Sequence, residues 1–159
     1  MVTAILSRGA TPRGDAPAVS WDERGLPELP VGATCLGEWQ LRDPAALTRA
    51  RHELGDLLQR QAVLSCADPD GLLLAFEELA SNGVRHGQGP VTVRVLCSPT
   101  GWLIDVVDAA VDSPPVLAVD RDPSFGGMGL RMVALLCPAH GWSVSDGAKH
   151  VWACLTVPA

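Results

Sequence analysis

The sequence contains no tyrosine and only two phenylalanines among its 159 residues. Hydrophobic residues still make up 47% of it, which is enough to fill a core and argues against global disorder. Val, Leu, Ala and the five Trp must therefore supply most of the buried surface. A chain of this length suffices for one compact domain and is too short for two ordinary ones.

The sequence also has no run of Lys and Arg residues. Lys and Arg together number 12 against 18 Asp and Glu, which gives a net charge of -6. A nucleic-acid binder usually presents a basic stripe, because neutralising phosphates supplies most of its affinity. The acidic balance therefore argues against a nucleic-acid partner.

The chain has no CxxC pair and no long apolar run. Its cysteines stand singly at positions 35, 66, 97, 137 and 154, which is typical of free thiols in a reducing compartment. No apolar stretch approaches the ~20 residues that cross a bilayer. The N-terminus lacks the basic and apolar segments of a signal peptide. We expect a cytoplasmic protein with no membrane partner.

The composition divides the chain into two regions. Residues 1–33 are rich in Pro, Gly, Ala and charge, which predicts a poorly ordered or irregularly packed extension that Trp21 could anchor. Residues 34–159 carry the periodic patterns of a domain. Two Asp-Pro pairs, at 43–44 and 68–69, predict N-caps followed by a proline in the first helical turn.

The patterns predict strands and helices in a definite order. Strands are expected over residues 34–41, 90–97, 102–108, 141–147 and 150–157, and helices over 45–64, 68–87 and 129–137. Hairpins alternating with helices predict a two-layer α/β sandwich, a mostly antiparallel sheet with helices on one face. The connection 109–129 is long for a compact domain, which favours a functional lid.

The helix expected over residues 68–87 has two stripes. The apolar stripe, which should pack on the sheet, consists of Leu72, Phe76, Leu79 and Gly83. The polar stripe contains Glu78, Asn82 and Arg85 at i, i+4 and i+7. A solvated helix face gives the same pattern, so the polar stripe alone does not identify a site.

Two later features have the same ambiguity. Asp108 ends a strand, where it could accept a hydrogen bond from an exocyclic amine such as that of adenine, or simply cap a turn. The run Gly126-Gly127-Met128-Gly129-Leu130 directly precedes a helix. Glycines there let the backbone come close to a ligand, and the first N–H groups of the helix can then bind an anion. Glycine clusters are common in loops, so this signal is also weak by itself.

In combination these features are more specific. Their order resembles the Bergerat (GHKL) ATP-binding fold of DNA gyrase, histidine kinases and Hsp-type chaperone ATPases. The order is a helical EExxxN, then a hairpin ending in Asp, then a long loop, then GGMGL opening a helix. The segments EELASNGVRHG, LIDVVDAAVDSPP, GGMGL and GAKHVWACL are most similar to bacterial anti-sigma-factor serine/threonine kinases. The resemblance covers roughly residues 34–158.

The resemblance implies a role for each matching residue, with ATP and Mg²⁺ as cofactors. Asn82 matches the asparagine that holds Mg²⁺, and Glu78 matches the base that activates a hydroxyl or water. Asp108 matches the adenine-binding aspartate, with Ala110 beside the adenine. Five residues of the lid match its phosphate-binding part: Gly126, Gly127, Met128, Gly129 and Leu130. Arg85, Arg131 and Lys149 are weaker phosphate candidates, since exposed cations usually only solvate a surface.

The chain departs from the family pattern at three places. Ala109-Ala110 replaces the glycines after the aspartate, Gly83 replaces a customary alanine, and His150 stands where a small hydroxyl residue is usual. The first and last departures put nucleotide affinity in doubt, with the alternative that DAAVDSPP resembles a variant found in the anti-sigma-like branch rather than a broken site. Gly83 costs up to ~1 kcal/mol of helix propensity.

The leading hypothesis is a regulatory kinase that binds ATP–Mg²⁺ and a sigma factor or similar protein, and phosphorylates an antagonist protein on Ser/Thr. The alternative is a non-catalytic module that sequesters a partner with a degenerate nucleotide site. ATP hydrolysis driving a conformational change is a third, less favoured hypothesis. A homodimer is also expected by resemblance, with Trp39 contributing to it.

Overall fold

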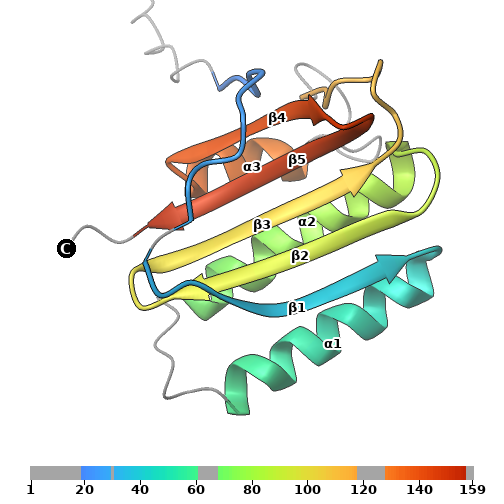
Figure 1. Cartoon of the computed structure of the whole chain (residues 1–159). Helices are drawn as coiled ribbons and strands as arrows, with labels where there is room; N and C mark the ends of the chain where they lie inside the picture. Colours follow the sequence, from blue (N-terminus) through green and yellow to red (C-terminus); the bar gives the residue numbers. More distant parts are fainter. Residues whose placement is uncertain (1–18, 30, 61–67, 118–127, 157–159) are drawn as a thin grey trace, which may run out of the picture.

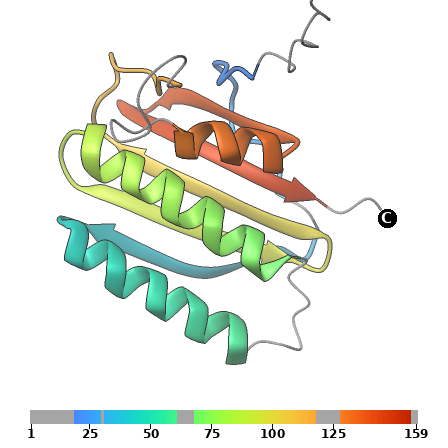
Figure 2. The same ribbon diagram turned by 180° about the vertical axis from the view of Figure 1, so that it is seen from behind.

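The computed structural model describes residues 19–29, 31–60, 68–117 and 128–156. Within these ranges, one antiparallel five-stranded sheet carries three helices on one face (Figures 1 and 2). The strands are β1 (Thr34–Leu41), β2 (Val91–Ser98), β3 (Gly101–Asp108), β4 (Ala139–Ser145) and β5 (Ala148–Thr156). The helices are α1 (Pro44–Arg60), α2 (Pro69–His86) and α3 (Met128–Leu136). The strand order is β1-β2-β3-β5-β4, and the two-layer α/β prediction is confirmed.

Both helix starts predicted from Asp-Pro pairs are confirmed. The Asp43 carboxylate accepts a hydrogen bond from the Ala46 N–H at 2.7 Å, and that of Asp68 accepts one from the Gly71 N–H at 2.9 Å. Each bond satisfies one of the backbone donors that a helix start leaves unpaired. The part of the predicted first helix beyond Arg60 lies outside the described residues.

Helix α2 lies between α1 and α3 and packs its apolar stripe on the sheet (Figure 2). All four residues of the expected stripe are buried: Leu72, Phe76, Leu79 and Gly83. Alternate residues of β2, including Val91, Val93 and Val95, face the helices and are buried as well. Burying each large apolar side chain contributes about 1.5–3 kcal/mol, so this layer is the main source of stability.

Trp39 of β1 also faces the helix layer. Its ring meets Phe76 edge-on with centroids 5.4 Å apart, and its indole N–H donates to the Glu53 carboxylate at 2.7 Å. Trp39 therefore holds α1 and α2 on the sheet. The homodimer contact expected at Trp39 stays a prediction.

The segment 19–29 pairs with the outer edge of β4 and then crosses the face of the sheet that has no helices (Figure 1). The Arg24 N–H donates to the Trp142 carbonyl at 2.7 Å, and the Trp152 indole N–H donates to the Arg24 carbonyl at 2.8 Å. Trp21, the expected anchor, is buried in the main core against the His140 ring. This part of the N-terminal extension thus belongs to the same packed unit, while residues 1–18 lie outside the described residues.

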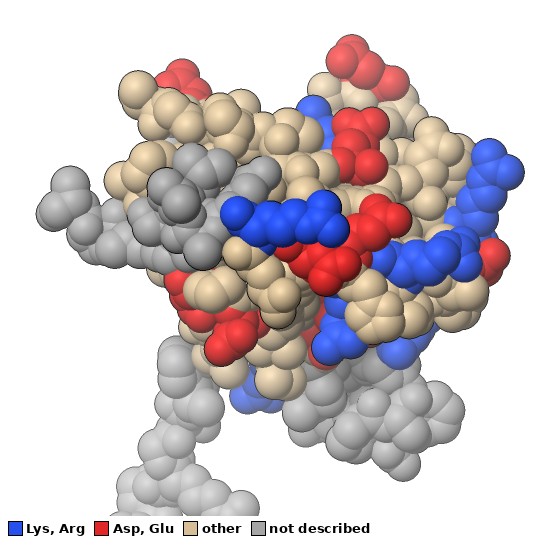
Figure 3. Space-filling view, turned by 90° about the horizontal axis from the view of Figure 1, so that it is seen from below, with Lys and Arg blue, Asp and Glu red and all other residues tan. Residues whose placement is uncertain are grey.

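The surface mixes charges of both signs. Figure 3 views the side of the molecule where α1 and β1 lie, and Lys and Arg side chains are interspersed there with Asp and Glu. None of the helices in the described part of the chain combines the length and the hydropathy of a membrane span.

Candidate functional site

Glu78 and Asn82 lie one turn apart on α2, about 6 Å along the helix axis, and both are half-buried. The buried apolar stripe of α2 fixes the helix on the sheet and so fixes the direction of this polar stripe. Among the residues that the structure describes, the Asn82 amide has no hydrogen-bond partner. Its oxygen is a hard donor of the kind that Mg²⁺ takes together with water and phosphate oxygens. Asn82 therefore fits the role of a metal ligand.

Glu78 lies directly against the start of α3. A Cβ atom built on Gly129 would collide with Oε2 of Glu78, so a larger residue there would displace the Glu78 carboxylate. Burial raises the pKa of the Glu78 carboxyl, repulsion from Glu77 raises it further, and Arg85 partly opposes both. A carboxyl with a raised pKa is better suited to accept a proton near neutral pH than an ordinary glutamate.

The packing around Gly83 explains why glycine stands here in place of the alanine of the family pattern. A Cβ at this position would lie 2.8 Å from Cγ1 of Val106 and 3.0 Å from Cγ1 of Val91. Both distances are too short for ordinary packing of stiff, buried valine side chains. The glycine thus brings α2, and with it the neighbouring Asn82, close to the sheet.

Asp108 lies at the other end of the site, where β3 meets the end of α2. A Cβ on Gly87 would lie 3.0 Å from the Asp108 carboxylate, and the Ala109 N–H donates to the Gln88 carbonyl at 2.8 Å. Gly87 follows Glu78 by nine residues, about 13 Å of helix. Asp108, on β3, therefore lies beside the C-terminal end of α2, whereas Asn82 and Glu78 lie about one and two turns before that end.

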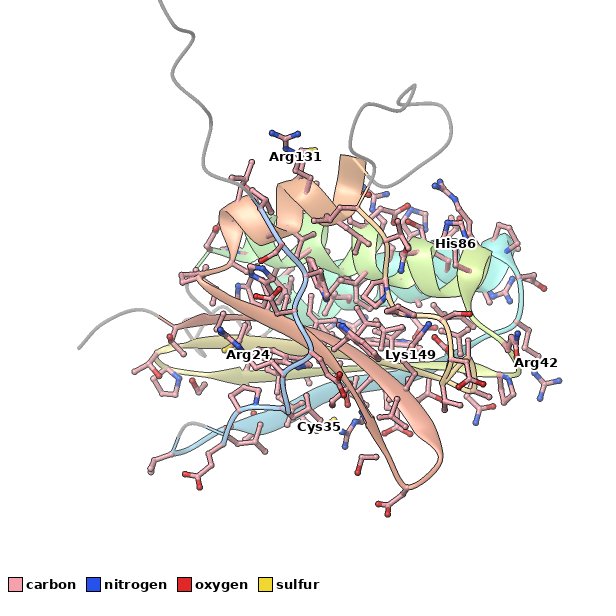
Figure 4. The ribbon with its side chains drawn as sticks, turned by 90° about the horizontal axis from the view of Figure 1, so that it is seen from above. Arg24, Cys35, Arg42, His86, Arg131 and Lys149 are labelled. Carbon is pink, nitrogen blue, oxygen red and sulfur yellow. The ribbon has the colours of Figure 1, made fainter. Side chains whose placement is uncertain are left out.

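The Asp108 carboxylate is held by two groups. Oδ1 accepts a hydrogen bond from the Ala110 N–H at 2.6 Å, and Oδ2 forms an ion pair with Nζ of Lys149 at 3.3 Å. Lys149 Nζ also donates to the Ser113 carbonyl at 2.9 Å, and only 4% of the Lys149 side chain is exposed. Figure 4 shows Lys149 beneath the helices, and α2 ends nearby at His86. Lys149, a weak phosphate candidate in the sequence, is thus paired with Asp108 in the structure.

The other candidates divide between the site and the core. Arg85 is exposed on α2 near Glu78, whereas Arg131 points from α3 away from the sheet (Figure 4). Leu130 and Ala110 are buried at 2% and 3% exposure, so backbone groups are what they could offer a ligand. Helix α3 begins at Met128, one residue before the predicted start, so Met128, Gly129 and Leu130 form its first turn. Gly126 and Gly127 lie outside the described residues.

His150 lies on the opposite face of the sheet. Its Nδ1 is 3.0 Å from Oδ1 of Asp105, a fully buried carboxylate that also accepts a hydrogen bond from Arg94 at 2.8 Å. Lys149 faces the helices, and its neighbour along β5 must face away from them. The His150 side chain therefore points away from Asp108.

Comparison with known proteins agrees with this geometry. A family model described as the histidine kinase-like ATPase domain matches residues 41–155, from the end of β1 almost to the end of β5. The matched range includes α2, Asp108, α3 and Lys149. A search of curated protein sequences found no match.

Proposed function

The chain belongs to the histidine kinase-like ATPase domain family, and from this premise we propose that it binds ATP with Mg²⁺ along α2 between Glu78 and Asp108. Membership of this family implies an ATP-binding regulatory function. The observation that carries the proposal is that α2 presents a half-buried glutamate and an amide with no hydrogen-bond partner among the described residues one turn apart, while the Asp108 carboxylate of β3 lies beside the end of the same helix.

Each group has a distinct role in binding. Asp108 accepts a hydrogen bond from the exocyclic amine of adenine, and Asn82 offers its amide oxygen to Mg²⁺. The start of α3 offers N–H groups to the phosphates, since Gly129 brings that end of the helix against Glu78. Mg²⁺, when bound, neutralises charge on the phosphates. Arg85, exposed beside Glu78, adds a positive charge at the same end.

Glu78 supports a phosphoryl-transfer activity. Its raised pKa makes it a better proton acceptor for an incoming Ser/Thr hydroxyl than a fully solvated glutamate. Phosphoryl transfer demands mainly positioning and charge stabilisation, which the α2 stripe and the start of α3 supply. We therefore propose that the chain phosphorylates a protein on Ser/Thr.

The partner follows from the motifs rather than from the geometry. The segments EELASNGVRHG and GAKHVWACL resemble those of anti-sigma-factor kinases, so we propose a sigma factor or similar protein as the bound partner. Its antagonist, an anti-anti-sigma protein, is the proposed phosphoryl acceptor. The exposed face of α1 and the segment 19–29 are the surfaces we expect partners to contact.

A non-catalytic, partner-sequestering module is the second candidate function. One observation favours it: Ala109-Ala110 replaces the flexible glycines that follow the aspartate in the family pattern. This replacement would weaken nucleotide binding without affecting the fold.

Transfer of labelled γ-phosphate separates the two candidates. The chain is incubated with γ-labelled ATP, Mg²⁺ and a protein extract from the organism that encodes it, in parallel with Glu78→Gln. A kinase labels an extract protein on Ser/Thr, and the variant loses this labelling while still binding ATP. Bound ATP without any labelled protein supports the sequestering module, and labelling that persists in Glu78→Gln contradicts the assigned base.

A further inference from the structure

We propose that Lys149 determines base specificity: it positions the Asp108 carboxylate to select purines that carry a 6-amino group. This inference rests on the proposed function and adds a residue to it. Lys149 acts through Asp108, so it is a positioning residue rather than a catalytic one.

The first observation is the burial of the pair. The side chains of Lys149 and Asp108 are only 4% and 1% exposed. Placing a charged group in such a site is unfavourable unless it meets an opposite charge and hydrogen-bond partners. Lys149 supplies the charge to Oδ2, and the Ala110 N–H supplies a hydrogen bond to Oδ1.

The second observation is that both oxygens of Asp108 are held from different directions. Lys149 approaches from β5, which pairs with β3 in register at this point, and Ala110 approaches from the start of the connection to α3. A carboxylate fixed at both oxygens cannot rotate freely. Each oxygen has two lone pairs, so one on each remains for a ligand after these contacts.

The third observation is that Lys149 also binds the turn that follows Asp108. Its Nζ donates to the Ser113 carbonyl at 2.9 Å, and the Ser113 N–H donates to the Ala110 carbonyl at 3.1 Å. Lys149 therefore fixes both the carboxylate and the turn that contains Ala110. The direction of the remaining lone pairs depends on a side chain that itself need not touch the nucleotide.

This arrangement has a chemical consequence. An oriented, ionised carboxylate accepts hydrogen bonds and donates none, so it favours a 6-amino group and repels a 6-oxo group. A buried site built for one hydrogen bond rejects an analogue that lacks the donor much more strongly than a flexible, solvated site does. Selectivity for the 6-amino group is thus the quantity that Lys149 controls.

The test compares ATP with purine riboside triphosphate, which differs only in lacking the 6-amino group. Dissociation constants for both are measured by calorimetry with Mg²⁺ for the wild-type chain, Lys149→Met and Lys149→Arg. Arg49→Met removes an exposed cation from α1 and is the matched control. The ratio of the two constants is the readout, because a partly unfolded sample changes both constants equally.

We expect the wild-type chain to prefer ATP by about 10-fold or more, the value of a hydrogen bond to a charged group. Lys149→Met should bring the ratio close to one by weakening ATP binding alone. Lys149→Arg should restore much of the preference, and Arg49→Met should leave it unchanged. A Lys149→Met ratio equal to that of the wild type overturns the inference and leaves Lys149 a purely structural ion-pair partner.

The remaining outcomes are also decisive. If Lys149→Met does not fold, Lys149→Gln is measured, and an unchanged ratio there overturns the inference. Equal wild-type affinity for both nucleotides overturns it while ATP binding stands. A wild-type chain that binds neither nucleotide refutes the proposed function, and the inference with it.

Discussion

Replacement of Gly83 by alanine tests the packing that places Asn82 over the sheet. Two effects oppose each other in this variant. Alanine improves helix propensity by about 1 kcal/mol. Its Cβ, however, would lie 2.8 Å from Val106 and 3.0 Å from Val91, and overpacking of a core costs about 1–3 kcal/mol. The net expectation is a destabilisation of about 1 kcal/mol.

Gly55 in α1 provides the matched control. It is also a glycine inside a helix, but a Cβ there would meet no atom within 4 Å. Only the propensity effect applies, so Gly55→Ala should stabilise the fold by up to about 1 kcal/mol. The two variants should therefore differ by about 2 kcal/mol and lie on opposite sides of the wild type.

Urea denaturation followed by tryptophan fluorescence measures both variants, and an unchanged slope would show that the midpoints report stability. In a thermal scan the difference corresponds to roughly 4–8 °C between the two midpoints. If Gly83→Ala is as stabilising as Gly55→Ala, α2 does not lie as close to the sheet as described. The explanation of Gly83 would then be wrong.

Two further predictions concern Glu78 and the N-terminal segment. Burial raises the pKa of Glu78, so the folded chain holds that proton more tightly than the unfolded chain. The stability of the wild type relative to Glu78→Gln should then fall as pH rises above the ordinary glutamate pKa, and a midpoint difference that does not depend on pH contradicts this. Trp21→Ala should lose about 3 kcal/mol, or roughly 6–12 °C, because Trp21 is 7% exposed in the core. Leu29→Ala, exposed on the same segment, is the control, and equal thermal midpoints would show that the segment does not stabilise the domain.

Local signals in the sequence were enough to predict most of the fold. Asp43 and Asp68 mark helix starts through contacts within three residues, and the stripe from Leu72 to Gly83 identifies the buried face of α2. The order of hairpins and helices then leaves few arrangements of one sheet and one helix layer. These features depend on near neighbours in the chain, which is why periodicity and capping rules identify them.

The contacts of the site depend on distant pairings. Asp108 and Lys149 meet only because β3 and β5 are adjacent in this register, which the separate strand patterns do not specify. The register also turns His150 toward Asp105 and away from the site, and nothing in the local sequence distinguishes these two directions. The contact between Glu78 and Gly129 similarly requires α3 to pack beside α2. The motifs therefore indicated which residues to consider, but not which of them pair.

The prediction for Asn82 tests the central claim most directly, through calorimetric titration of the purified chain with ATP, with and without Mg²⁺, alongside Asn82→Ala. Gln59→Ala, exposed on α1, is the matched control. We predict micromolar binding that depends on Mg²⁺ and weakens by about 10-fold or more in Asn82→Ala, since a metal ligand is lost, while Gln59→Ala binds like the wild type. Absence of binding up to millimolar ATP, or equal affinity in Asn82→Ala, would contradict an ATP–Mg²⁺ site on α2.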